Sequence, residues 1–240
     1  MSAPHFFVDP PLEQQALLSP EDTRHALRSL RLRPGDEVTL GDDMGAVARG
    51  RVRGEQSGRA IIEVLSVTRE EPGVPRLSVL LSPPKGERLA WATQKLGELG
   101  ASELALLETE RSVRKLDRTR MRQRLARLQA IAREAAMQSR QAFVMKVRAG
   151  GEVRTETARG DSPLVMLWEE ADCRLADALP ELPGHVRLLV GPEGGFSREE
   201  VAAARSAGGT TASLGRAILR SETAAVVAAA LTLARYGRLG

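Results

Sequence analysis

The chain has 240 residues, 42% of them hydrophobic and 28% charged, which is enough for a buried core in one large or two modest domains. The formal net charge is only +4. No apolar run approaches the roughly 20 residues of a membrane span, and the start, MSAPHFFVDPP, lacks the pattern of a signal peptide. Because Cys173 is the single cysteine, an intramolecular disulfide is excluded. The chain has only three histidines, so we also expect no metal site. We expect a cytoplasmic protein without membrane contact.

Residues 1–72 carry the pattern of a β-rich domain. Short apolar or alternating runs are separated by glycine-rich turns at about ten-residue spacing, which predicts a small barrel or sandwich. One helix is expected over 20–32, because Ser19 suits an N-cap and Pro20 suits the first helical position. The expected strands are 6–8, 37–40, 46–52 and 60–67.

From residue 76 onward, apolar strands alternate with helical patterns, which is typical of a mostly parallel sheet with helices on both faces. The charged and proline-rich stretch 70–75 is the best boundary, so a second domain is expected over 73–240. Ser197 followed by Glu200 predicts a capping box, and Gly100 predicts a helix end. The expected strands are 77–81, 103–107, 142–147, 164–168, 186–190 and 211–214, and the expected helices are 87–99, 117–138, 197–207 and 221–236.

The last expected helix is almost wholly apolar over 224–233. A helix that is apolar all round must be covered on every side. A partner subunit would cover it in a homodimer, and burial within one subunit is the alternative.

Two glycine-marked turns each follow a buried strand near the C-terminus, at 191–195 and at 212–215. The ends of parallel strands are where open α/β sheets build ligand sites, although either turn could be purely structural. The first turn lacks the dinucleotide fingerprint and the lysine of a phosphate-binding loop, which argues against a nucleotide-dependent oxidoreductase. We expect these loops to hold a small cofactor rich in hydrogen-bonding groups.

Motifs along the whole chain carry a family resemblance. The stretches LLVGPEGGFSREE and LGRAILRSETA, together with HALRSLRLRPGD, KGER, QKLGELG and EAAMQSR, resemble the bacterial ribosomal RNA uridine-N3 methyltransferases of the RsmE type, in the family's order. These enzymes belong to the SPOUT superfamily, which uses S-adenosylmethionine.

The resemblance implies a fold, a cofactor and partners. It implies a PUA-like RNA-binding β-barrel domain over 1–72 and an α/β SPOUT domain over 73–240 with a trefoil knot, acting as a homodimer on 16S rRNA of the small ribosomal subunit. The implied reaction is methylation of uridine-1498 at N3. The cofactor-binding residues that it implies are Leu167, Trp168, Glu169, Val190, Gly191, Pro192, Glu193, Gly194, Gly195, Ser213, Leu214, Gly215, Ile218 and Leu219.

One motif position departs from the family. Ala217 stands where the family has an arginine, and Arg216 comes one residue early, where a regular element would point it elsewhere. Arg220 and Glu222 match. We assign Arg220 to the stabilisation of negative charge on the uracil carbonyls and Glu222 to proton transfer or orientation. As an alternative, Glu222 is a first-turn helix carboxylate favoured by the helix dipole.

The candidate RNA contacts are basic. Arg24, Arg28 and Arg31 fall four and three residues apart, which on a helix places them on one face that could meet phosphates or could simply be solvated. The family motifs add Arg33, Lys85 and Arg140. A non-enzymatic rRNA-binding or ribosome assembly factor is the rival function, and it predicts no binding of S-adenosylmethionine.

Overall fold

The computed structural model describes residues 3–111, 118–160 and 162–239. Contacts between Cα atoms divide the chain into two compact units. The first runs to Pro72 and includes Ala136–Val144, and the second comprises Gly73–Ala135 and the chain from Met145 onward. Nothing in the sequence pattern had indicated that a segment so far along the chain would return to the first unit.

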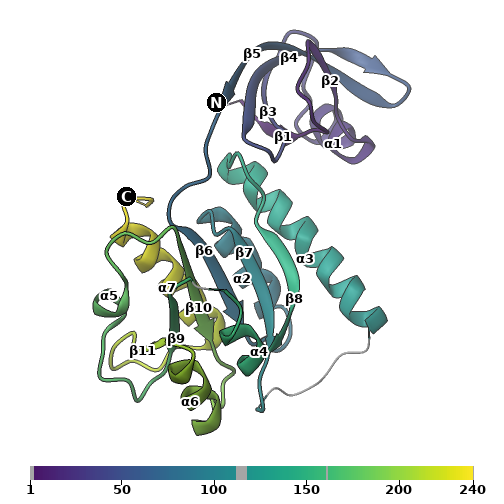
Figure 1. The fold of residues 1–240 in the computed structure, drawn as a ribbon. Coiled ribbons are helices and arrows are strands. Elements are labelled where there is room, and N and C mark those ends of the chain that lie inside the picture. The colour runs from purple at the N-terminus through teal and green to yellow at the C-terminus, as the bar shows by residue number, and fades with distance from the viewer. Residues whose placement is uncertain (1–2, 112–117, 161, 240) are drawn as a thin grey trace. The chain divides into compact units, whose positions relative to one another are not determined.

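The first unit is built on one curled sheet of five strands in the order β1-β3-β4-β5-β2 (Figure 1). Its strands are β1 (His5–Phe7), β2 (Gln15–Leu17), β3 (Glu37–Gly41), β4 (Ala46–Gln56) and β5 (Arg59–Arg69). Strand β1 pairs with β3 in parallel, and the other pairs are antiparallel. Alternate side chains of β4 are buried, as a strand with one face on a core requires. The fully buried Phe6, Leu18, Leu40 and Ile62 form that core, against which Met137 packs.

The expected helix over 20–32 is only partly present. Helix α1 (Pro20–Arg24) begins as predicted, with the Ser19 hydroxyl accepting from the amide of Asp22 at 3.0 Å. The chain then widens into a π-helical turn, η1 (His25–Ser29), and Arg31 has a left-handed φ of 57°. The prediction that Arg24, Arg28 and Arg31 share one face of a regular helix is therefore wrong.

The second unit contains a six-stranded parallel sheet in the order β11-β9-β10-β6-β7-β8 (Figure 1). Its strands are β6 (Arg76–Leu81), β7 (Glu103–Glu108), β8 (Lys146–Glu152), β9 (Leu164–Leu167), β10 (His185–Val190) and β11 (Thr210–Ala212). The central strands β6 and β10 are buried along almost their whole length, as expected for a parallel sheet covered on both faces. The expected fold class, a parallel α/β domain after a small PUA-like β domain, is confirmed; the knot stays a prediction.

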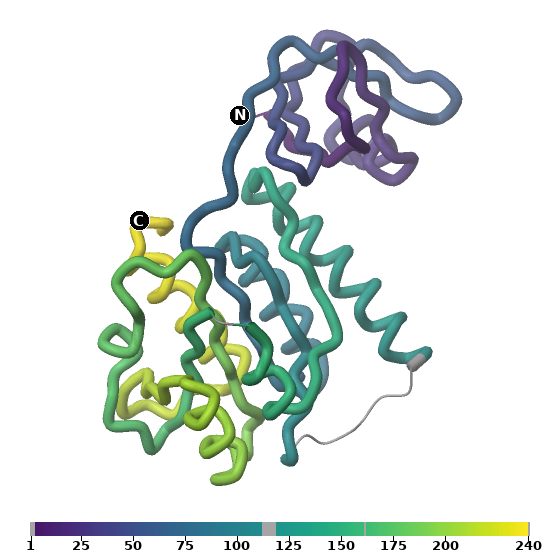
Figure 2. Tube along the Cα trace, in the orientation of Figure 1, coloured from purple at the N-terminus to yellow at the C-terminus, as the bar shows by residue number. Residues whose placement is uncertain are grey.

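Helices and short turns connect these strands (Figure 2). They are α2 (Arg88–Glu98), α3 (Arg118–Ser139), α4 (Val153–Thr157), α5 (Leu175–Ala178), α6 (Arg198–Ser206) and α7 (Ser221–Arg235). The expected first residue of α3, Asp117, lies outside the described residues. The strand expected at 142–147 was wrong, since β8 begins only at Lys146 and continues through Gly150 and Gly151. None of the helices in the described part of the chain is long and apolar enough to cross a membrane.

Helix α7 packs against α2, β6 and β10 through a buried face that includes Ala225, Ala228 and Leu233. Its opposite side is only partly covered by the described residues: Leu231 is 51% exposed, and Trp91 on the neighbouring α2 is 43% exposed. Complete burial of α7 within one subunit, one of the two expectations, is therefore wrong.

Candidate active site

A cavity of about 370 Å³ lies at the carboxyl ends of β9, β10 and β11. Its wall comes from three loops, 167–169, 190–196 and 212–219, and from the start of α7. Because the strands are parallel, the loops after them meet at one edge of the sheet although they are distant in sequence. The cavity is of the size usual for small-molecule sites.

All the predicted cofactor residues except Gly194 line this cavity. They share it with residues that we did not predict, namely Phe196, Ala212, Arg216, Ala217, Ser221 and Ala224. Ser221 and Ala224 open an apolar helix, so their sequence context indicated burial in a core and not a ligand wall. Arg216 also corrects an expectation, since it lines the cavity and does not point elsewhere.

The glycine loop after β10 (191–195) is contacted by Glu169 at Gly195 and by Arg111 at Gly194. Gly195 has a φ of 67°, and a Cβ there would lie 3.2 Å from Oε1 of Glu169, so only glycine fits without displacing that carboxylate. Gly194 lies outside the cavity wall, and its carbonyl accepts a hydrogen bond from Nη1 of Arg111. The loop is thus held from outside by a side chain that follows β7.

The end of this loop is fixed by the predicted capping box, which is confirmed. The amide of Ser197 donates to Oε2 of Glu200 at 2.8 Å, and the amide of Glu200 donates to the Ser197 hydroxyl at 3.2 Å. The other oxygen of Glu200 accepts from the amide of Glu110 at 3.0 Å. One buried carboxylate therefore ties the start of α6 to the segment after β7.

Trp168 forms another part of the wall and is supported from α6. The guanidinium carbon of Arg205 lies 5.3 Å from the centre of the Trp168 ring, within the range of a cation–π contact. Nη2 of Arg205 also donates to Oγ1 of Thr211 at 2.9 Å, which fixes the guanidinium in place.

The first turn of α7 carries unsatisfied polar groups beside the cavity. Among the described residues, neither the buried Ser221 hydroxyl nor the buried Oε2 of Glu222 has a hydrogen-bond partner. Native proteins leave few such groups, so these point to a ligand. The Ser221 hydroxyl, together with the backbone groups of the glycine loops on the same wall, fits a small cofactor with hydrogen-bonding edges.

The two predicted catalytic residues lie beside the cavity and not on its wall. Arg220 is the N-cap residue of α7 and is exposed, whereas Glu222 is only 6% exposed. Oε1 of Glu222 lies 3.6 Å from Nε of Arg88, and Nη1 of Arg88 lies 3.8 Å from Oε1 of Glu193. Arg88 is a site residue that we missed; its place in the KGER motif was the only signal.

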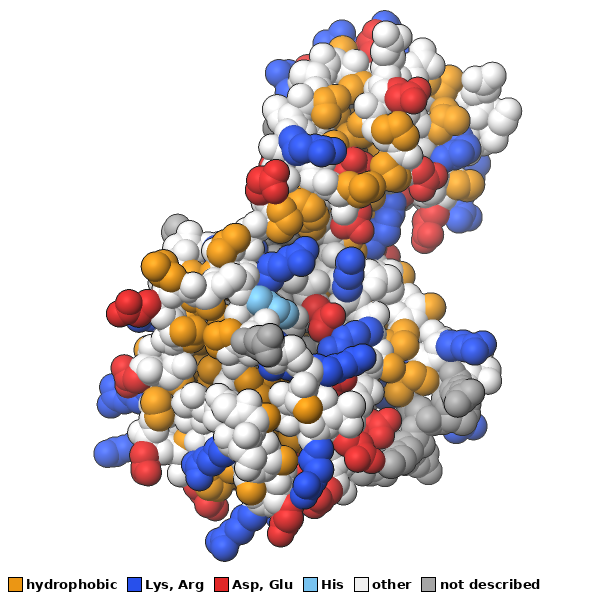
Figure 3. All heavy atoms as spheres, in the orientation of Figure 1, with side chains coloured by type: hydrophobic (Ala, Val, Ile, Leu, Met, Phe, Trp, Pro, Cys, Tyr) orange, Lys and Arg blue, Asp and Glu red, His pale blue; other side chains and the backbone are white. Residues whose placement is uncertain are grey.

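The predicted RNA contacts are divided between the units. Arg24, Arg28, Arg31, Arg33 and Arg140 are exposed in the first unit, and Lys85 is exposed in the second. Arg140 has a left-handed φ of 57° and donates from Nη2 to the carbonyl of Ala3 at 3.1 Å. On the face shown in Figure 3, acidic and basic side chains are interspersed.

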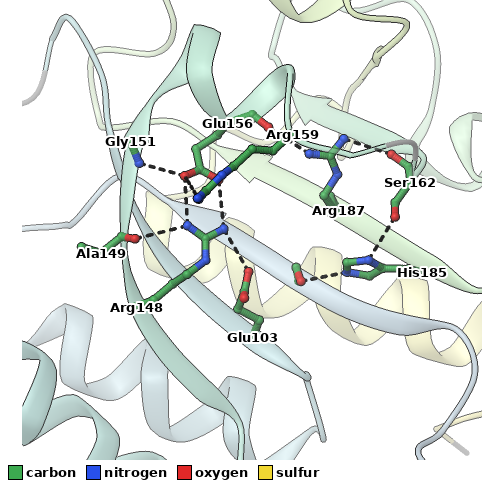
Figure 4. Close-up of polar contacts among 10 residues, drawn as sticks. Glu103, Arg148, Ala149, Gly151, Glu156, Arg159, Ser162, His185 and Arg187 are labelled. Carbon is green, nitrogen blue, oxygen red and sulfur yellow. Dashed lines mark hydrogen bonds and ion pairs between the residues drawn. The ribbon is translucent and has the colours of Figure 1, made fainter.

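A second group of charged residues lies on one face of the parallel sheet and not at the cavity (Figure 4). Glu156, 1% exposed, receives two hydrogen bonds of 2.9 Å from Arg148, one of 2.9 Å from the amide of Gly151 and one of 3.1 Å from Arg159. Burial raises the pKa of Glu156, but the bonds from Arg148 and Gly151 outweigh it and hold the pKa below its usual value. The hydrogen bond to Glu156 raises the pKa of Arg148.

Arg187 and His185 extend this network. The guanidinium of Arg187 donates to the carbonyls of Glu156, Gly160 and Ser162 at 2.9 to 3.2 Å, while burial lowers its pKa. The His185 ring lies between the hydroxyls of Ser78 and Ser162 at 2.8 and 3.1 Å. Burial, followed by the nearby Arg187 cation, lowers the pKa of His185.

Comparison with known proteins gives two matches to protein families. An RNA methyltransferase domain matches residues 70–233, and an RNA methyltransferase PUA domain matches residues 18–65. Ribosomal RNA small subunit methyltransferase E of Mycobacterium tuberculosis is 36% identical, over 95% of this chain and 90% of that protein. The protein of the same name from Bacillus subtilis is 30% identical, over 87% of this chain and 85% of its own length.

Solved structures agree with these matches. Ribosomal RNA small subunit methyltransferase E from Neisseria gonorrhoeae, bound to S-adenosylmethionine, superposes with a TM-score of 0.87 at 30% identity, over 97% of this chain and 98% of that one. A methyltransferase from Legionella pneumophila in complex with S-adenosylmethionine gives a TM-score of 0.89 at 26% identity, over 98% of both chains.

Proposed function

Because this chain belongs to the ribosomal RNA small subunit methyltransferase E family, we propose that it transfers a methyl group from S-adenosylmethionine to N3 of a uridine in 16S rRNA, the family's uridine-1498. The observation that carries the proposal is the cavity at the carboxyl ends of β9, β10 and β11, whose wall includes the Ser221 hydroxyl, a buried group without a hydrogen-bond partner among the described residues. Bound there, S-adenosylmethionine supplies an electrophilic methyl group.

The chain's own residues bind and orient the reactants. The three loops enclose the cofactor, and Trp168, held by Arg205, gives one rigid side of the cavity. Holding the reacting atoms in line supplies much of the acceleration of such a transfer. The exposed guanidinium of Arg220 makes no hydrogen bond or ion pair with any described residue, so its donors are available for a uracil carbonyl. Oε2 of Glu222 has no hydrogen-bond partner among the described residues, so it can accept the N3 proton.

The exposed arginines of the first unit suit contacts with RNA phosphates. Arg24, Arg28, Arg31 and Arg33 lie within the matched PUA domain, and we assign them with Arg140 and Lys85 to the RNA backbone. Such contacts fix the position of the RNA and carry no base specificity. An enzyme that acts on ribosomal subunits would work in the cytoplasm.

The side of α7 that the described residues leave partly exposed suits a second copy of the chain. Leu231 on α7 and Trp91 on α2 are large, apolar and about half exposed, and Ile218 at the cavity is 93% exposed. A homodimer through α7 would cover part of this surface. Light scattering should give the mass of a dimer, and Leu231→Glu should give that of a monomer.

Methyl transfer itself is tested with small ribosomal subunits from a strain that lacks the endogenous enzyme. The purified protein and isotopically labelled S-adenosylmethionine should yield one labelled N3-methyluridine by mass spectrometry. Absence of that nucleoside would contradict the proposed function. The binder alternative predicts no heat on titration with S-adenosylmethionine. Arg220→Ala should keep cofactor binding and lose turnover, and unchanged turnover would remove Arg220 from the mechanism.

A further inference from the structure

The structure assigns a role to Arg88 at the start of α2: we propose that Arg88 and Glu222 together bind the N3 edge of the target uracil. Arg88 donates to a uracil carbonyl, and Glu222 accepts the N3 proton. This inference rests on the proposed function, because it takes uridine N3 as the atom that is methylated.

Arg88 is held near two carboxylates without being hydrogen-bonded to either. The distances of 3.6 Å to Glu222 and 3.8 Å to Glu193 are ion-pair distances too long for hydrogen bonds. Among the described residues, the guanidinium makes no hydrogen bond, and its side chain is 42% exposed. Five N–H donors are therefore available at the place where the loop after β10 meets the start of α7.

Glu222 is the complementary acceptor. Its side chain is only 8% exposed, and its Oε2 is buried without a hydrogen-bond partner among the described residues. Leaving a buried carboxylate oxygen unpaired costs free energy. A ligand that donates a hydrogen to Oε2 removes that cost.

The N3 edge of uracil has the matching pattern. It presents one N–H donor between two carbonyl acceptors. A carboxylate oxygen beside a guanidinium offers an acceptor beside a donor, and both hydrogen bonds are strengthened by charge. The adjacent Ser221 lines the cofactor cavity, so a base bound at Glu222 has its N3 close to the methyl donor.

The reaction then balances within this site. The N3–H bond breaks and its proton passes to Oε2 of Glu222, while N3 forms a bond to the methyl carbon. The carbon–sulfur bond of the donor breaks, and the sulfur leaves as a neutral thioether. Arg88 stabilises the negative charge that develops on the uracil carbonyl.

The test compares Arg88→Met, Arg88→Lys and a matched control, Arg127→Met. Arg127 forms an exposed ion pair of 2.6 Å with Glu87, the residue before Arg88, and does not line the cavity. Each protein is tested for folding by thermal unfolding and for cofactor affinity by calorimetry. Single-turnover methylation is then measured on RNA that carries uridine or 5-fluorouridine at the target position, since fluorine makes the N3 proton more acidic.

We expect Arg88→Met to bind the cofactor normally but to methylate uridine about 100-fold more slowly. The loss should be clearly smaller with 5-fluorouridine, because an acidic N3 needs less help from a cation. Arg88→Lys should recover part of the rate, and Arg127→Met should match the wild type.

Three results would overturn the inference: a fully active Arg88→Met, equal losses on the two substrates, or loss of cofactor binding in both Arg88 variants. A wild-type protein that leaves uridine N3 unmethylated overturns the proposed function and this inference with it. An active wild type beside an equally active Arg88→Met overturns only the inference.

Discussion

The second unit holds two groups of charged residues that differ in how completely their hydrogen bonds are made. Around Glu156, the carboxylate is fully bonded to Arg148, Arg159 and an amide at 2.9 to 3.1 Å. Around Arg88, the ion-pair distances are 3.6 and 3.8 Å, and Oε2 of Glu222 lacks a partner among the described residues. Satisfied buried charges rigidify a fold, whereas an unsatisfied one beside a cavity costs stability unless a ligand completes it.

The two groups also differ in where they lie: the fully bonded group lies on the sheet, and the other lies beside the cavity. The Glu156 network lies across β7, β8 and β10 and attaches α4 and the residues after it to the sheet (Figure 4). The Arg88 group lies where two cavity segments meet a helix start. We therefore expect substitutions in the first group to change stability and substitutions in the second to change activity.

The largest expected effect is on stability. Glu156→Ala should lower the free energy of unfolding by about 3–5 kcal/mol, because it leaves Arg148 partly buried without its bidentate partner. Urea unfolding measures this loss. Replacing both partners, in Arg148→Met with Glu156→Leu, should recover much of it. If the double variant were as unstable as Glu156→Ala, the loss would not come from an unpaired charge.

At Glu222, beside the cavity, we expect a large loss of activity with little loss of stability. Glu222→Gln keeps the shape of the side chain and should slow methylation by about 100-fold through loss of the proton acceptor. Its stability should change by less than about 0.5 kcal/mol, because Oε2 has no partner among the described residues and Oε1 loses only a long ion pair of 3.6 Å with the half-exposed Arg88. A loss of up to about 1 kcal/mol with full activity would instead support the helix-dipole role. Single-turnover rates and urea unfolding together decide between these roles.

The sequence predicted the strands and helix caps, whose hydrogen bonds are complete, better than the group around Arg88, whose hydrogen bonds are not. Apolar strands and capping signals are local, so the central strands, the α6 capping box and the two glycine turns could be placed from the residues themselves. The pattern failed at Gly150 and Gly151, where β8 runs through two glycines, and at His25–Ser29, where a π-helical turn breaks the spacing of the arginines.

Two of the cavity loops were predicted because they follow recognisable strands, and the third, 167–169, was predicted only from the family resemblance. The rest of the candidate site was missed for a physical reason. Arg88 lies over 100 residues before Glu193 and Glu222 in the sequence and meets them only in the folded chain. Spacing carries no information about such pairs. Arg216 was misplaced because its loop is not a regular element, so helical or strand periodicity did not apply to it.

A smaller effect is expected where a satisfied contact supports the cavity. Arg205→Met removes the cation over the Trp168 ring and should weaken S-adenosylmethionine binding by about threefold to fivefold, which corresponds to roughly 0.5–1 kcal/mol. Calorimetry measures the affinity, and the fluorescence of Trp168 in a Trp91→Phe background reports the ring's environment. Arg198→Met on the same helix is the control. Equal affinities for the two variants would show that Trp168 needs no support.

The smallest effect is a pH dependence of the satisfied network. The pKa of His185 is lower in the folded protein than in the unfolded chain, because burial and the Arg187 cation disfavour its charged form. The unfolded state therefore takes up the proton first as the pH falls, and the stability present above about pH 6.5 is lost progressively below it. His185→Gln should flatten this decline in urea unfolding between about pH 7 and about pH 5. Parallel pH profiles for the variant and the wild type would assign the decline to other groups.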